Sequence, residues 1–196
     1  LYINTRDRFD PVDLQQLVLP PRLVVLELTY LGFLTLPPLP DATLQRLVWC
    51  ELGASGIVRR TGPLPSTLLY LQCHVGLAKF ELPDLPPFLQ HLGLNCCQLT
   101  SDLPALPATL KHLSVAECGL ARLPDLPLQL NYLSCHSNPY LTVLPALPNT
   151  VEYLDCTHNR MTAPLPDLPG SLLHLDCSYN GMTTLPALPG RLKYLD

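Results

Sequence analysis

The sequence lacks the features that would place it in several large classes of protein. It has no run of about 20 apolar residues, the length that a membrane-spanning helix needs. None of its eight cysteines forms a CxxC pair, the spacing typical of zinc sites. Glycine-rich phosphate loops and nucleophile-elbow motifs are also absent. We therefore expect no membrane span, no metal site, no cofactor and no catalytic residue in this chain.

Charge is scarce as well, and what there is does not form a basic stripe. Charged residues make up 14% of the chain and hydrophobic residues 47%, a composition that argues against disorder despite 23 prolines. The net charge is −4, and residues 61–196 carry six Lys plus Arg against ten Asp plus Glu. Nucleic acid is therefore not an expected partner.

What the chain does contain is one phrase repeated along its length. A leucine anchors each copy, with steps of 24, 21, 21, 20, 21, 21 and 20 residues from Leu47 onward. Leu26 lies 21 residues upstream of Leu47, and Leu1 is a candidate for one more anchor. The regular anchors are Leu47, Leu71, Leu92, Leu113, Leu133, Leu154, Leu175 and Leu195.

Between anchors lies the phrase LPxLPxxLxxL, which matches six times, for example at 103–113 and 144–154. This period and pattern are typical of leucine-rich repeats. Alternation around each anchor predicts a short strand, and stacked copies predict a curved parallel sheet on the concave side. Because proline recurs every third residue, the convex side should be extended and polyproline-like, with very little helix.

The repeats indicate a single leucine-rich repeat domain over residues 1–196. Residues 1–18 form a partial or degenerate repeat, 19–81 form irregular repeats, and 82–196 form regular repeats of 20–21 residues. The extra residues of the long repeat lie in GASGIVRRTG (53–62), which we expect to be a loop. The chain has no initiator methionine, and neither end shows a polar cap, so we expect it to be part of a longer protein.

Asparagine recurs three residues after the cysteine of the last full repeats, where buried side chains can bond the backbone as it leaves the strand. These candidates for a structural ladder are Asn138, Asn159 and Asn180. Earlier repeats have Leu31, Leu52, Gly76, Cys97 and Cys118 at the same position, so the N-terminal half is the degenerate one.

The positions of the cysteines indicate core residues rather than catalytic residues or metal ligands. Cys73, Cys135, Cys156 and Cys177 share one repeat position with leucine, valine and tryptophan. A position of that kind is an apolar slot, which a free cysteine fills as a small hydrophobic residue. We therefore expect buried free thiols, although disulfides in a secreted chain remain the alternative.

Function then belongs to the opposite, concave side of the strands. The position before each anchor holds Tyr or His in seven consecutive strands, and aspartates follow at the next outward position in the C-terminal strands. Tyrosine is enriched at binding hot spots, whereas the plainer explanation is that aromatics suit exposed strands. The candidate partner-binding residues are Tyr70, His91, His112, Tyr132, Tyr153, His174, Tyr194, Asp155, Asp176 and His136.

Two chemical alternatives are weaker. His91 and His112 should be neighbours and could form a metal pair, but the sequence offers no third ligand, and a pH-responsive surface fits them better. Asp155 and Asp176 would serve as an acid/base pair only if their environments differed. On an open, wet face they are better interpreted as a solvated acidic patch.

The phrase LPxLPxxLxxLxVxxNxLTxLP is the signature of the short repeats in bacterial type III secreted effectors of the YopM, IpaH and SspH group. Residues 144–169 and 165–189 resemble this phrase, with cysteine in place of the usual valine. The resemblance is close over 82–196, looser over 19–81 and absent over 1–18. The chain departs from the group in its missing N-terminal asparagines, its many cysteines and its lack of an N-terminal helical cap.

The resemblance implies secretion by a bacterium into a host cell, to the cytoplasm or nucleus, and binding of a host protein. In many relatives the solenoid precedes a cysteine-dependent E3 ubiquitin ligase domain, for which it selects or restrains substrates. The active-site motif of that domain is not in these residues, so ligase activity could only belong to a continuation of the chain, in cis. The alternative is a stand-alone or extracellular recognition or adhesion protein without enzymatic activity.

Overall fold

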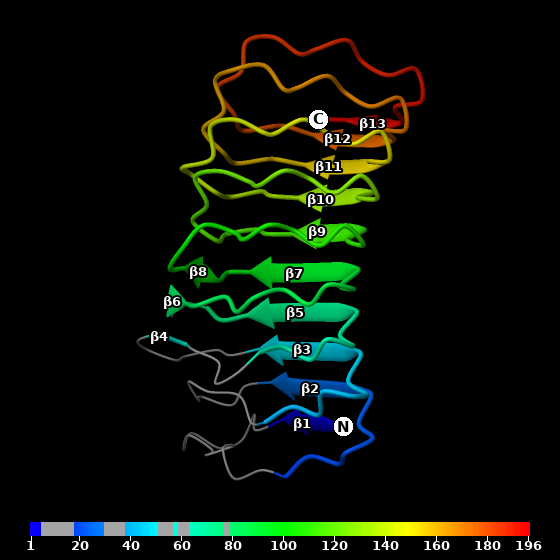
Figure 1. The fold of residues 1–196 in the computed structure, drawn as a ribbon. Coiled ribbons are helices and arrows are strands. Elements are labelled where there is room, and N and C mark those ends of the chain that lie inside the picture. The colour runs from blue at the N-terminus through cyan, green and yellow to red at the C-terminus, as the bar shows by residue number, and fades with distance from the viewer. Residues whose placement is uncertain (5–17, 30–37, 51–56, 59–62, 77–78) are drawn as a thin grey trace.

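The computed structural model describes residues 1–4, 18–29, 38–50, 57–58, 63–76 and 79–196. Figure 1 shows successive turns of chain stacked along one axis, with the two termini at opposite ends. The described residues contain no helix, and therefore none that could cross a bilayer. The chain is a parallel β-solenoid, as the repeat predicted.

Ten short strands form one parallel sheet along the solenoid (Figure 1). Neighbouring strands pair one repeat apart, with each anchor opposite the next, for example Leu113 opposite Leu133. All eight regular anchors lie in strands. The strands are β1 (Tyr2–Asn4), β2 (Val25–Thr29), β3 (Arg46–Cys50), β5 (Tyr70–His74), β7 (His91–Asn95), β9 (His112–Ser114), β10 (Tyr132–Ser134), β11 (Tyr153–Asp155), β12 (His174–Asp176) and β13 (Tyr194–Leu195).

The core follows from the alternation within each strand. Anchor leucines from Leu26 to Leu175 are at most 1% exposed, and full burial of such a side chain contributes about 1.5–3 kcal/mol. The position two residues on is buried as well, whether it holds Trp49, Leu94 or Cys135. Anchors and their second neighbours thus form two parallel apolar columns.

The cysteines that lie two residues after an anchor, which we call the inner thiols, are buried, as expected. All eight cysteines lie in the described residues, and none forms a disulfide. Burial in apolar surroundings raises the pKa of the Cys135 and Cys156 thiols far above the ordinary value, which keeps them protonated.

The three asparagines bond the backbone of two successive turns. Asn138 Nδ2 donates to Cys135 O (2.9 Å) in its own turn and to Val115 O (2.8 Å) in the turn before. The side-chain oxygen of Asn159 accepts the Asn138 N–H at 2.8 Å. Asn180 Nδ2 repeats the pattern toward Cys177 O and Cys156 O. Each asparagine therefore joins neighbouring turns as well as closing its own.

In earlier turns a cysteine thiol takes the place of the asparagine side-chain amide as hydrogen-bond donor to the backbone. Cys97 Sγ lies 3.5 Å from Cys73 O, one turn back, and Cys118 Sγ donates to Leu94 O in the same way. The thiol supplies a weak donor but lacks the carboxamide oxygen. Of the other residues expected at this position, Leu31 and Leu52 lie outside the described residues.

A positive φ precedes each of these side chains. Five consecutive turns have a non-glycine residue in the left-handed region, a conformation that costs on the order of 1–3 kcal/mol. The bend turns the chain so that the next side chain points inward, where it makes the bonds described above. The residues are Cys96 (φ 54°), Glu117 (57°), Ser137 (58°), His158 (53°) and Tyr179 (54°).

The prolines of the convex side lie in extended chain that ends in a tight turn. In five of the six phrases the carbonyl of the second proline accepts a hydrogen bond from the residue three places on, as in Leu110 N to Pro107 O (3.0 Å). A hydroxyl column then joins this turn to the preceding repeat, as in Thr109 Oγ1 to Leu89 O (2.8 Å). The other members found are Thr43, Thr67, Thr150 and Ser171.

A second, three-stranded sheet was not predicted. It pairs β4 (Ile57–Val58), β6 (Lys79–Phe80) and β8 (Gln98–Leu99) in parallel. The expected loop at 53–62 therefore contains a two-residue strand, while its remaining residues lie outside the described part of the chain. Strands this short carry no detectable periodicity, so the sequence gives no sign of them.

Removing one ladder asparagine should lower the free energy of unfolding more than a surface substitution does. Asn159→Ala deletes two donated bonds and one accepted bond among buried backbone groups. We expect a loss of about 3 kcal/mol, since each buried group left unpaired costs about 1–3 kcal/mol. Urea unfolding measures it, with exposed Asn149→Ala as the matched control. Equal midpoints for the two variants would contradict the bonding role.

The inner thiols should react only when the chain unfolds. Cys135, Cys156 and Cys177 are at most 9% exposed, whereas Cys50 at the end of β3 and Cys96 just after β7 are half-buried. We expect iodoacetamide to modify Cys50 and Cys96, the two half-buried thiols, first, and the three inner thiols only in urea. Peptide mass spectrometry distinguishes the sites, and rapid native labelling of all three would refute their placement.

Candidate protein-binding face

The aromatic residues predicted at the concave face form a row of seven rings, the first six of them stacked, which we call the ring column. It consists of Tyr70, His91, His112, Tyr132, Tyr153, His174 and Tyr194. Each lies one residue before an anchor, so parallel register places it opposite the next. Successive centroids from the first ring to the sixth are 4.0, 4.0, 3.9, 4.3 and 4.4 Å apart, with near-parallel planes.

The stacking distances show which side of the sheet is concave. Strands in a sheet lie about 4.8 Å apart, so rings at 3.9–4.4 Å have converged above it. The planes differ by at most 14° in this part of the column, so each ring covers the face of its neighbour. What the column presents outward is therefore a row of ring edges with tyrosine hydroxyls and imidazole nitrogens.

The two ends of the ring column differ. At the N-terminal end the Arg46 guanidinium lies 3.7 Å from the Tyr70 centroid, a cation–π contact, and Arg46 Nε lies 3.4 Å from Glu27 Oε1. At the other end the rings of His174 and Tyr194 are 5.5 Å apart and tilted by 43°. Tyr194 is also 65% exposed. The regular stack therefore ends at His174.

Small and polar side chains follow the ring column on the next outward position of each strand. Tyr70 donates its hydroxyl to Gln72 Oε1 (2.6 Å), and Ser114 donates to Asn95 Oδ1 (2.9 Å). At Gly93 a Cβ would lie 3.3 Å from Gln72 Cγ and 3.6 Å from His91 Nε2. The glycine therefore leaves room for its neighbours at that point.

Two of the predicted carboxylates lie opposite each other on β11 and β12. Asp155 accepts the Thr157 N–H (3.1 Å) and lies 3.3 Å from Ser134 Oγ. Asp176 Oδ1 accepts from Ser178 N (3.2 Å) and Ser178 Oγ (2.8 Å). These bonds hold both carboxylates beside the tyrosines of the ring column.

His136 lies away from the ring column, beyond the end of β10. Its Nδ1 is 3.1 Å from Ser137 Oγ. A second aromatic pair, which the sequence did not single out, lies nearby: the rings of His158 and Tyr179 stack at 4.1 Å. Both follow a strand by the same number of residues, and that shared repeat position was the available signal.

Within the ring column, burial shifts the pKa of four side chains away from the ordinary value: His91, His112, Tyr132 and Tyr153. Burial, together with the nearby His112 and Arg46, lowers the pKa of His91 to about 4. Burial lowers the pKa of His112 in the same direction. Burial, together with Tyr132 and the neighbouring aspartates, raises the pKa of Tyr153 to about 12. At neutral pH these four side chains are therefore uncharged.

The possible metal pair does not gain ligands from the fold. The His91 and His112 rings lie face to face at 4.0 Å, so their nitrogens lie side by side. Within the described residues, no group of three or more His, Cys, Asp or Glu is placed to share an ion.

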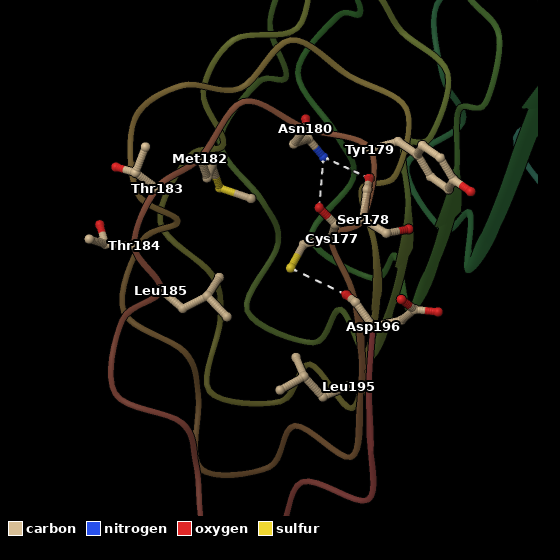
Figure 2. A pocket seen from close by; sticks show the side chains of 10 residues that line it. All are labelled: Cys177, Ser178, Tyr179, Asn180, Met182, Thr183, Thr184, Leu185, Leu195 and Asp196. Carbon is tan, nitrogen blue, oxygen red and sulfur yellow. Dashed lines mark hydrogen bonds between the residues drawn. The ribbon is translucent and has the colours of Figure 1, made fainter.

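A pocket of about 320 Å³ lies at the C-terminal end of the solenoid (Figure 2). Its lining includes Cys177, Asn180, Met182 and Leu195 from the last two turns. The ring column does not contribute to it. Figure 2 shows Cys177 and Asn180 hydrogen-bonded within the pocket wall, so this is the interior of the repeat seen at its end.

Comparison with solved structures finds proteins with a similar fold. YopM from Yersinia pestis, described as a leucine-rich effector protein, aligns with a TM-score of 0.64 and 28% identity over 89% of this chain and 53% of its own. The chain folds as a leucine-rich repeat solenoid similar to that of YopM. It spans about half the length of that YopM chain. The sequence matches no protein-family profile and no curated protein.

Two other structures align at lower identity. CroV588, described as a circular leucine-rich repeat protein, is 22% identical over 95% of this chain and 35% of its own, with a TM-score of 0.53. YopM from Yersinia enterocolitica WA-314 is 22% identical over 91% and 60%, with a TM-score of 0.38. The first of these supports the fold.

Acid should destabilise the fold through the ring column. The pKa of His91 is lowered to about 4, against about 6.5 in an unfolded chain, so the unfolded state binds the extra proton between these values. Stability is thus complete above pH 6.5 and falls toward pH 4. We expect the urea midpoint to drop over this range, and to drop less in His91→Tyr/His112→Tyr. The same slope in both proteins would contradict this origin.

Proposed function

We propose that this chain is the host-protein recognition solenoid of a bacterial effector, and that its partner binds on the ring column of the concave face. The observation that carries the proposal is the continuous stack of rings from Tyr70 to His174. The YopM-type fold supports it, because solenoids of this kind offer an extended concave surface to partners.

The chemistry of the ring column suits a protein partner. Its ring faces are covered by neighbouring rings, so a flat ligand has no open face on which to stack within the column. Its edges combine apolar carbon with hydroxyl and imidazole groups at low conformational cost. A protein surface offers both apolar side chains and backbone hydrogen-bonding groups to such edges.

The ligase connection is a separate and finer proposal that rests on the resemblance. On this proposal the solenoid selects substrates for, or restrains, an E3 ubiquitin ligase domain in a longer chain. The extracellular adhesion alternative is disfavoured by the eight cysteines, none of which forms a disulfide. Ubiquitin transfer by the full-length protein, with and without residues 1–196, would separate a ligase from a stand-alone adaptor.

Truncating the centre of the ring column should weaken binding of the partner strongly. A hot-spot tyrosine contributes about 2 kcal/mol or more, so Tyr132→Ala/Tyr153→Ala should weaken binding at least about 30-fold. The partner is first captured from host lysate, then purified and titrated against the variant. Tyr140→Ala is the matched control, since Tyr140 is 65% exposed outside the ring column.

The competing location is the arginine pair Arg59 and Arg60, which lies outside the described residues. If Arg59→Ala/Arg60→Ala loses the partner while the tyrosine variant keeps it, the assignment to the concave face is wrong. Unfolding curves of each variant separate lost contact from lost structure.

A further inference from the structure

The chain itself shows how a guanidinium sits on the concave face. Arg46 lies over the end of the ring column, 3.7 Å from the Tyr70 centroid. Its Nε also lies 3.4 Å from the carboxylate of Glu27, one strand away. Glu27 occupies the repeat position of Asp155 and Asp176, next to the rings. An arginine is therefore satisfied here by an aromatic ring and a carboxylate from the adjacent position.

The C-terminal half of the concave face has carboxylates at the position of Glu27 but no arginine beside them. The outward positions of β9 to β13 and of the residues that directly continue them carry Asp155, Asp176 and Asp196, and no lysine or arginine. Within the described part of the chain, Asp155 and Asp176 form hydrogen bonds but no ion pair. Their backbone and serine bonds fix them in place, so the negative charge is pre-organised.

We infer that the concave face between β10 and β12 binds an arginine-containing basic segment of the partner protein, and this inference rests on the proposed function. Asp155 and Asp176 are opposite each other on strands about 4.8 Å apart, so one guanidinium can reach both. Arginine fits better than lysine because its five donors can bridge two acceptors. The hydroxyls of Tyr132 and Tyr153 are neutral and can accept the remaining donors.

Charge complementarity decides between this occupant and others. An acidic segment would meet two fixed carboxylates, and an apolar segment would bury them without compensation. A basic segment neutralises them and gains association rate from the attraction, which added salt should weaken.

The experiment is selection from a random peptide library displayed on phage, using the full chain as bait. We expect the selected peptides to be rich in arginine. A synthetic peptide carrying the selected sequence should lose about tenfold or more in affinity for Asp155→Asn/Asp176→Asn. Asp125→Asn/Asp167→Asn makes the same charge change at exposed convex positions and should bind like the unmodified chain.

The possible outcomes distinguish a failure of the arginine inference from a failure of the proposed binding function. Peptides that need Tyr132 and Tyr153 but show no arginine enrichment would overturn the arginine inference and leave the ring column as the binding face. Equal losses in both aspartate variants would also overturn it, since the attraction would then be diffuse. Peptides that bind Tyr132→Ala/Tyr153→Ala undiminished would overturn the proposed function itself.

Discussion

Parallel stacking in constant register is the constraint on which the rest of this structure depends. Because each strand lies opposite the same position of the next repeat, any residue type that recurs in the sequence becomes a column in space. Leucine at the anchor becomes the core, asparagine becomes a ladder that joins turns, and threonine becomes a hydroxyl column on the convex turns. No single turn could bury its leucine or pair its backbone alone, so each column stabilises only because its neighbours are present.

The same register gives the ring column two roles that share one set of atoms. Ring centroids 3.9–4.4 Å apart are close to contact, while strands are about 4.8 Å apart, so the rings resist further closure of the concave side. They therefore set a limit on curvature while they form the surface that a partner would meet. A tyrosine-to-histidine exchange keeps the stack and changes only its outer edge. A change to alanine removes both the contact surface and the spacer, which is why unfolding curves must accompany any binding measurement.

Much of this arrangement could be predicted from the sequence, because a solenoid translates periodicity directly into position. The anchors, the buried thiols and the membership of the ring column follow from counting residues. Ring stacking could not be predicted, since it depends on side-chain rotation and on the curvature of the sheet. The hydroxyl column was missed because Phe88 and Gln129 interrupt it, so its pattern is weaker than that of the leucines. The left-handed residues Glu117 and Tyr179 carry no local sign of their conformation, which the tertiary bonds of the next residue impose.

The residue types inside the solenoid and those on its concave face change independently along the chain. This independence bears on function. Along the chain the ladder changes from cysteine at Cys97 and Cys118 to asparagine at Asn138, Asn159 and Asn180. The ring column runs unbroken across that change, because alternate residues of a strand face opposite sides. Its continuity therefore does not follow from the packing of the interior. It needs a cause on the concave side itself, and the two causes available there are the spacing of the turns and the binding of a partner. Spacing accounts for rings in the consecutive turns from β5 to β13, but it does not account for the fixed carboxylates that accompany them only in the C-terminal turns. These carboxylates favour a partner.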